Sequence, residues 1–130
     1  MEITREVARK VLSLVDMGLT RGKGEPEPGK MCIEAVVCYA LGMPHGDQPI
    51  CVAPSLREFK IGLNDADWSS NAARAAGLRR LALVQLGSAD TLDECEFVRR
   101  LVDCTIRQWL PKTLRRAADR FPKIAAALHE

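Results

Sequence analysis

The stretch that decides the fold covers residues 31–41 and reads MCIEAVVCYAL. Its one charged residue is Glu34, and its length suits either a buried strand or a short buried helix. Glu34 and Ala40 favour a helix, and the ending GMP at residues 42–44 is typical of a helix C-terminus rather than of a strand end. We therefore expect a central helix that is buried on most of its sides.

Helical patterns lie on both sides of this stretch. Thr4 is a candidate N-cap for a first helix, and Pro54 suits the first position of a later one. Ser69 or Ser70 can cap the helix that follows, where apolar residues recur at helical spacing. Together with the central helix, these signals predict helices over residues 5–17, 31–41, 54–63 and 71–86.

The last third of the chain also has a helical pattern. Thr91 and Glu94 have the spacing of a capping box, which opens a helix. Pro111 has no amide to donate, so it either kinks this helix or begins the next one, over residues 112–121. One side of the pattern is apolar, and we expect Trp109 and Phe121 to face a core. The residues on that side are Val98, Leu101, Val102, Thr105, Ile106 and Trp109.

No alternating pattern of useful length suggests a strand. The sequence therefore predicts an all-α protein, a compact single-domain bundle of six to seven helices over residues 1–130. Residues 18–30 contain four glycines and two prolines and can bury almost nothing, so we expect them to form either a flexible loop or a segment that a partner orders.

Composition narrows the function classes. The 130 residues are 47% hydrophobic and 28% charged, which is typical of a soluble globular protein. Nineteen basic and seventeen acidic residues give a net charge of +2, too balanced to imply nucleic acid by itself. No apolar run approaches the roughly 18 residues of a membrane span. The N-terminus alternates charges instead of showing a secretory signal, so we predict a cytoplasmic protein without membrane contact.

Residues 24–30, GEPEPGK, have the spacing of a phosphate-binding loop, but we reject nucleotide binding at this site. The next residue is Met31, where a magnesium-binding hydroxyl is needed, and the two prolines offer no amide to a phosphate. We expect no cofactor.

The five cysteines include no C-x-x-C pair, so a disulfide framework is not expected. Cys38, His45, Asp47 and Cys51 carry zinc-competent side chains, but their spacing fits no common zinc site, and we expect no metal.

Cys32 is a candidate nucleophile because helix amides at its position would favour the thiolate. The histidines available as a base are His45, beyond the far end of the same helix, and His129, near the chain end. We assign no catalytic residue and keep a thiol-dependent enzyme using Cys32 as an alternative.

Two features are candidate binding sites. Lys112, Arg116, Arg120 and Lys123 form one stripe on a helix, which is either a solvated face or a contact for phosphates or for an acidic protein surface. Trp68 lies in the polar stretch 64–71, which is either a helix-capping turn or the setting of a binding anchor.

Three stretches between residues 30 and 88 carry a resemblance. They read MCIEAVVCYALGMPHGDQPICV, FKIGLNDADWSSNAARAAGLRRLA and QLGS. This part of the chain resembles a family of short uncharacterised bacterial and mobile-element proteins of phage type. The resemblance implies no transferable activity, and small proteins of this kind include the anti-CRISPR inhibitors.

We therefore expect a non-enzymatic protein-binding module, in its most specific form a mobile-element-encoded inhibitor of a host defence complex. The alternatives are the thiol enzyme and a nucleic-acid-binding protein that uses the C-terminal basic stripe. The sequence also leaves open whether the chain forms a homodimer.

Overall fold

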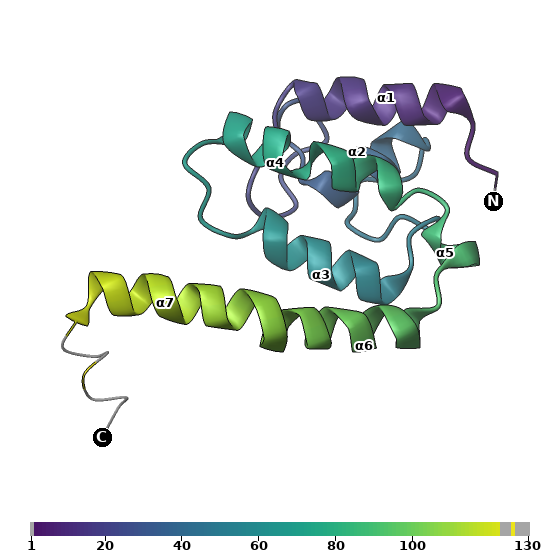
Figure 1. Ribbon diagram of the computed structural model, residues 1–130. Helices are drawn as coiled ribbons and strands as arrows, with labels where there is room; N and C mark the ends of the chain where they lie inside the picture. The colour runs from purple at the N-terminus through teal and green to yellow at the C-terminus, as the bar shows by residue number, and fades with distance from the viewer. Residues whose placement is uncertain (1, 123–125, 127–130) are drawn as a thin grey trace. The chain divides into compact units, whose positions relative to one another are not determined.

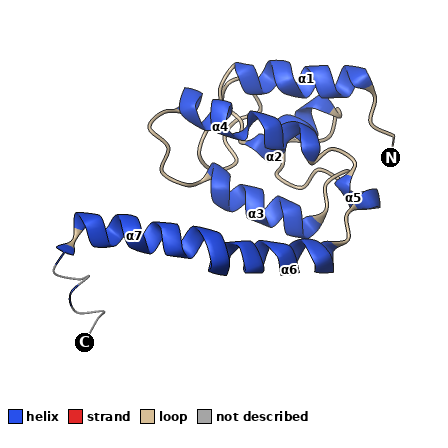
Figure 2. Cartoon of the chain, in the orientation of Figure 1, coloured by secondary structure: helices blue, strands red, loops and turns tan. Residues whose placement is uncertain are grey.

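The computed structural model describes residues 2–122 and 126, and the chain divides into two compact units, residues 1–94 and 95–130. Every regular element in the described ranges is helical (Figures 1 and 2), apart from one isolated antiparallel bridge between Gly24 and Met31. The all-α prediction is confirmed, while the single domain over residues 1–130 stays a prediction. The helices are α1 (Arg5–Asp16), α2 (Ile33–Ala40), α3 (Pro54–Asn64), α4 (Asn71–Val84), α5 (Ser88–Thr91), α6 (Glu94–Cys104) and α7 (Leu110–Arg120), with a π-helical turn η1 (Thr105–Trp109) before α7.

Helix α2 is the centre of the first unit, as its apolar sequence predicts. All of its residues except Tyr39 are buried, and it contacts α1, α3 and α4. Such burial leaves its first amides without water, so the protein must supply their partners. Cys32 Sγ accepts from the Ala35 amide at 3.3 Å, and Asn64 Oδ1 accepts from the Ile33 amide at 3.2 Å. The N-terminus of α2 is therefore held by a residue of α3 as well as by its own cap.

Helices α1 and α4 pack against each other beside α2. The predicted caps are confirmed, because the Thr4 hydroxyl accepts from the Val7 amide and the Ser70 hydroxyl accepts from the Ala73 amide. Gly18 follows α1 with a φ of +115°, a conformation that glycine adopts without a steric penalty. The N-terminal helices thus begin and end close to where the sequence predicts.

The capping box predicted at Thr91 and Glu94 is wrong. Thr91 instead ends the short helix α5, where its hydroxyl donates to the Gly87 carbonyl at 3.1 Å. Glu94 begins α6, and its Oε2 accepts from the Ser55 amide at 2.7 Å. The reason lies in α3, whose N-cap Ala53 has no side-chain acceptor and whose first residue is a proline. The Glu94 carboxylate therefore caps α3 rather than its own helix.

The loop over residues 18–30 is tied to the first unit by backbone hydrogen bonds. The Thr20 amide donates to the Met31 carbonyl at 3.0 Å, and the Cys32 amide donates to the Lys23 carbonyl at 3.3 Å. Leu19 is fully buried, so the expectation that the loop buries almost nothing is wrong at this residue. Its flexibility stays a prediction.

The second unit contains α6 after Glu94, η1 and α7, which form one continuous helical run. Pro111 is near the start of α7, as one of the two sequence alternatives predicts. The turn before it is π-helical, and the Leu110 amide donates to the Thr105 carbonyl. No residue of α6, η1 or α7 is buried among those described, and Trp109 and Phe121 are exposed rather than core-facing. That prediction is wrong because the buried apolar residues described in the chain all lie between Val11 and Ala82.

Candidate functional site

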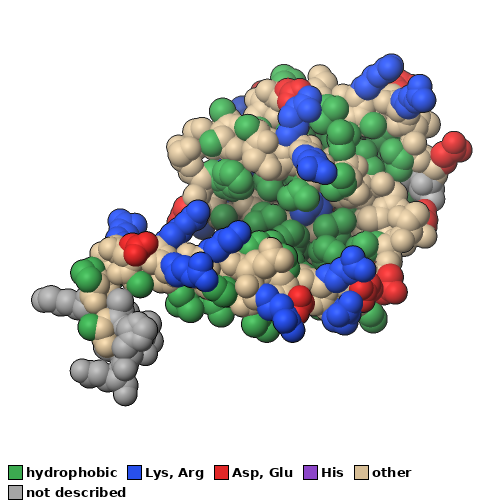
Figure 3. Space-filling view, in the orientation of Figure 1, with side chains coloured by type: hydrophobic (Ala, Val, Ile, Leu, Met, Phe, Trp, Pro, Cys, Tyr) green, Lys and Arg blue, Asp and Glu red, His purple; other side chains and the backbone are tan. Residues whose placement is uncertain are grey.

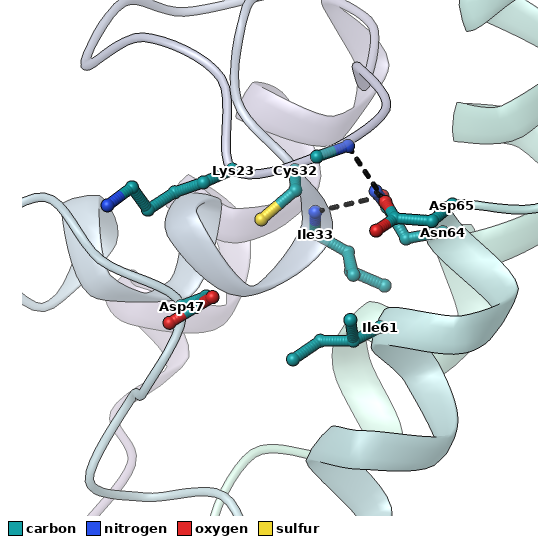
Figure 4. A pocket seen from close by; sticks show the side chains of 8 residues that line it. Lys23, Cys32, Ile33, Asp47, Ile61, Asn64 and Asp65 are labelled. Atoms are coloured by element: carbon teal, nitrogen blue, oxygen red, sulfur yellow. Dashed lines mark hydrogen bonds between the residues drawn. The ribbon is translucent and has the colours of Figure 1, made fainter.

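The pocket next to Cys32 is the first candidate site. It has a volume of about 40 Å³, enough for a few water molecules but not for a substrate. Figure 4 shows Lys23, Cys32 and Asp47 on one side and the residues of α3 on the other. The pocket is lined by Gly22, Lys23, Cys32, Ile33, Asp47, Ile61, Asn64 and Asp65.

Cys32 is poorly placed to act as a nucleophile. Its side chain is buried, and burial raises the pKa of the thiol more than the amide hydrogen bonds from Ala35 and Glu34 lower it. His45 Nε2 lies 3.0 Å from the Gly24 carbonyl, so the candidate base is engaged by backbone rather than by Cys32. His129 lies outside the described residues. These contacts weigh against the thiol-enzyme alternative. The helix position of Cys32 predicts a lowered thiol pKa, but burial of the side chain raises this pKa by more.

A buried ion pair in the first unit was missed by the sequence analysis. Lys60 Nζ of α3 donates to Glu34 Oε1 of α2, and both side chains are fully buried. Burial raises the pKa of Glu34 and lowers the pKa of Lys60, while each partner opposes the shift of the other. A signal was present, because each of these charges lies on the apolar face of its helix. The pair is enclosed by protein and is therefore structural.

A second buried network fixes the loop and α3 relative to α4. Arg74 Nε donates to the Asn64 carbonyl at 2.7 Å, and its guanidinium also reaches the Leu19 carbonyl at 3.4 Å. Asn64 Nδ2 donates to the Thr20 carbonyl at 2.9 Å. Arg74 is thus buried as a bridge between backbone carbonyls of the loop and of α3.

Trp68 has a structural role in the turn between α3 and α4. Its Nε1 donates to the Leu63 carbonyl at 2.9 Å, and the ring packs against Gly77 of α4. A Cβ atom at position 77 would lie 2.4 Å from two ring carbons, so the contact requires glycine. The proposed role of Trp68 as a binding anchor stays a prediction.

Two wider surface hollows lie between the end of α1, the loop and the start of α4. They share Gly29 and Asn71, and their volumes are about 310 and 220 Å³. The charged residues of the larger one are already paired, because Arg79 donates to both carboxylate oxygens of Asp16 at 2.7 and 3.0 Å. The hollows therefore bring together no set of catalytic groups.

The continuous helix of α6, η1 and α7 carries the most extensive exposed apolar surface. We call its exposed apolar residues the apolar stripe, and they are between 44% and 59% exposed. Most are four residues apart, a spacing that advances by about 40° per step around an α-helix. The extra residue of the π-helical turn sets this rotation back, so the stripe continues along one side. The apolar stripe consists of Val98, Val102, Ile106, Trp109, Leu110 and Leu114.

The predicted basic residues lie on α7, and Lys112 and Arg116 are on the side of the helix away from Leu110 and Leu114, because residues two apart do not share a face of an α-helix. Lys112, Arg116 and Arg120 are all exposed on α7 at helical spacing, while Lys123 lies outside the described residues. Figure 3 shows Lys and Arg side chains gathered over this helix next to hydrophobic side chains. The sequence predicts both the basic and the apolar residues of this helix, but the prediction that the apolar ones face a core is wrong.

Metal-ligating side chains, membrane-spanning helices and likeness to known proteins each bear on the possible functions. Within the described residues, no group of three or more His, Cys, Asp and Glu side chains could hold a metal ion. None of the helices described there combines the length and apolar character that a membrane crossing requires. Comparisons of the chain with protein families, with curated proteins and with solved structures found no match. The resemblance to phage-type proteins stays a prediction.

Proposed function

We propose that the chain is a non-enzymatic protein-binding module whose docking element is the helix of α6, η1 and α7. The observation that carries this proposal is the apolar stripe, which is half exposed along its whole length. Exposed apolar surface of this extent is typical of interaction sites, and an amphipathic helix commonly binds by laying its apolar face into a groove. Trp109 is a residue type that is favoured at binding hot spots.

The first unit supports this function as a scaffold. Its helices enclose a continuous core and two buried polar networks, so this unit is well packed by itself. Its pocket at Cys32 is too small for a substrate, and its thiol is buried. A binding role is therefore better supported than catalysis.

The test uses capture from lysate of the native host with three forms of the full chain. The stripe variant Ile106→Gln and Leu114→Gln removes apolar surface but keeps residues that favour helices. The matched control Arg99→Gln and Arg100→Gln makes the same number of changes away from the stripe. We expect one identified protein to be captured by the wild type and the control and lost with the stripe variant. That protein, once purified, should form a stoichiometric complex.

A partner that is retained equally by the stripe variant would contradict the proposal, as would the absence of any stoichiometric partner. The expectation that the partner belongs to a host defence complex stays a prediction, and the identity of the captured protein decides it.

A further inference from the structure

The side of α7 that lies opposite the apolar stripe is basic. Lys112, Arg115 and Arg116 are exposed there, and their spacings of three and four residues place them on one face of the helix. Each residue of an α-helix advances by about 100°, so Lys112 lies about 160° around α7 from Leu110. Arg116 is related to Leu114 in the same way. We call Lys112, Arg115 and Arg116 the basic face.

The positive charge of the basic face has little compensation within α7. The helix has four basic residues and one acidic residue, a net charge of 4 − 1 = +3. Within residues 2–122 and 126, Lys112, Arg115 and Arg116 have no ion-pair partner, although Asp119 lies three residues after Arg116. Like charges three and four residues apart destabilise a helix. A polyanion that binds along this face would relieve their repulsion.

The side chains around the basic face favour phosphates over a protein surface. The large apolar side chains of α7, Leu110 and Leu114, both belong to the apolar stripe, so the basic face has no apolar anchor from this helix. Protein interfaces have an apolar centre from which charged residues are depleted. Contacts to the phosphates of a nucleic acid need only cationic and polar donors.

The angle between the two faces also disfavours an anionic lipid surface. A helix that lies in a membrane interface buries its apolar face, so Leu110 and Leu114 would point into the lipid. Lys112 and Arg116 would then lie about 10 Å away, across the diameter of the helix. The attraction of anionic headgroups is largely screened beyond about 8 Å at physiological salt. The basic face therefore needs an anionic partner on its own side of the helix.

The aromatic residues favour a duplex over a single strand. Proteins that bind single strands without sequence preference stack the bases on aromatic side chains. Trp109 belongs to the apolar stripe, and residues 110–120 contain no Phe, Trp or Tyr. Arg120, four residues after Arg116, continues the row of cations, and from Lys112 to Arg120 the helix rises by about 12 Å. Three or four successive phosphates of one duplex strand cover a similar distance along the axis, at about 3.4 Å each.

We propose that the basic face, together with Arg120, binds the phosphate backbone of a nucleic-acid duplex independently of its base sequence. This inference goes beyond the proposed function and does not rest on it. The apolar stripe remains available for a protein on the other side of the same helix. The chain can thus hold a protein and a duplex at once, on opposite sides of α7.

The test is a fluorescence-anisotropy titration of random-sequence DNA and RNA duplexes with the full chain. We expect binding at about 10 μM protein in about 50 mM salt, in the range of non-specific duplex binding. Three or four phosphate contacts give a slope of about −3 to −4 in log affinity against log salt. Affinity should therefore fall by about 40- to 150-fold between about 50 and 200 mM salt. The two duplexes show whether the backbone of DNA or that of RNA is bound more tightly.

The chain offers a matched pair of charge reversals. Lys112→Glu with Arg116→Glu changes two exposed cations that are four residues apart on the basic face. The control, Arg5→Glu with Arg9→Glu, makes the same change of net charge at the same spacing on α1, where both arginines are exposed. We expect the first variant to lose about tenfold or more in affinity at about 50 mM salt, and the control less than about threefold. Circular dichroism checks helix content, and Lys112→Gln with Arg116→Gln replaces the reversal if that variant loses helix.

The remaining outcomes decide whether the basic face is the binding site. The stripe variant Ile106→Gln with Leu114→Gln should keep its duplex affinity, and a loss of binding with helix content intact would assign the contact to the stripe. Equal losses in the two charge-reversed variants would show that only net charge matters, which overturns the inference. The same holds for binding to phosphatidylserine vesicles or to polyglutamate without binding to either duplex. The lysate capture with the stripe variant tests the proposed function separately.

Discussion

The side chains of Glu34 and Lys60 show how single residues hold the first unit together. Lys60→Met leaves the Glu34 carboxylate buried without its cation, and breaking a buried pair in this way costs about 3–5 kcal/mol. We expect a loss of unfolding free energy of this size in urea denaturation. The double variant Glu34→Leu with Lys60→Met should be clearly more stable than Lys60→Met, because neither buried charge remains. Equal stability of these two variants would contradict the pairing.

Gly77 is a second residue at which a single methyl group should matter. Gly77→Ala places its Cβ 2.4 Å from the Trp68 ring, so the ring must move and its hydrogen bond to Leu63 is disturbed. We expect a loss of about 1–3 kcal/mol of unfolding free energy, as is typical of overpacking. The control Gly62→Ala meets no atom within 4 Å and lies inside α3. It should stabilise the protein by about 0.5–1 kcal/mol, the usual gain from alanine in a helix. Effects of the same sign at both glycines would be evidence against the Trp68 contact.

At the scale of the elements, α3 depends on a cap from outside its own sequence. The Ser55 amide lowers the pKa of Glu94 from its usual value near 4.5, because it donates to the carboxylate. A carboxyl group whose pKa is lower in the folded state contributes stability above its unfolded pKa and loses it as the pH falls through the folded pKa. We expect wild type to lose more thermal stability than Glu94→Gln between about pH 6 and about pH 3. An identical pH dependence of the melting temperature in the two proteins would refute the cap.

At the scale of the whole molecule, the chain is expected to contain a unit that folds by itself. The buried apolar residues described by the structure lie between Val11 and Ala82, and Glu94 supplies the cap of α3. We therefore expect a fragment of residues 1–94 to be helical and to unfold cooperatively in urea. A fragment that ends before Glu94 should be less stable, because α3 loses its cap. A gradual, non-cooperative transition of the 1–94 fragment would show that this unit needs residues 95–130.

Much of the first unit follows from local signals in the sequence. The apolar run over residues 31–41 predicts a buried central helix, and Thr4, Pro54 and Ser70 mark where other helices begin. These signals succeed because capping and helical periodicity act within a few residues of the chain.

The features that failed from sequence depend on partners far along the chain. Thr91 and Glu94 have the spacing of a capping box, but the uncapped amide of Ser55, 39 residues away, takes the carboxylate. Cys32 has the helix position of a reactive thiol, but burial raises its pKa. The chain alone specifies an amphipathic helix from Val98 onward. Only the tertiary structure decides that its apolar side is exposed, because burial depends on which elements pack together and not on the pattern of one helix.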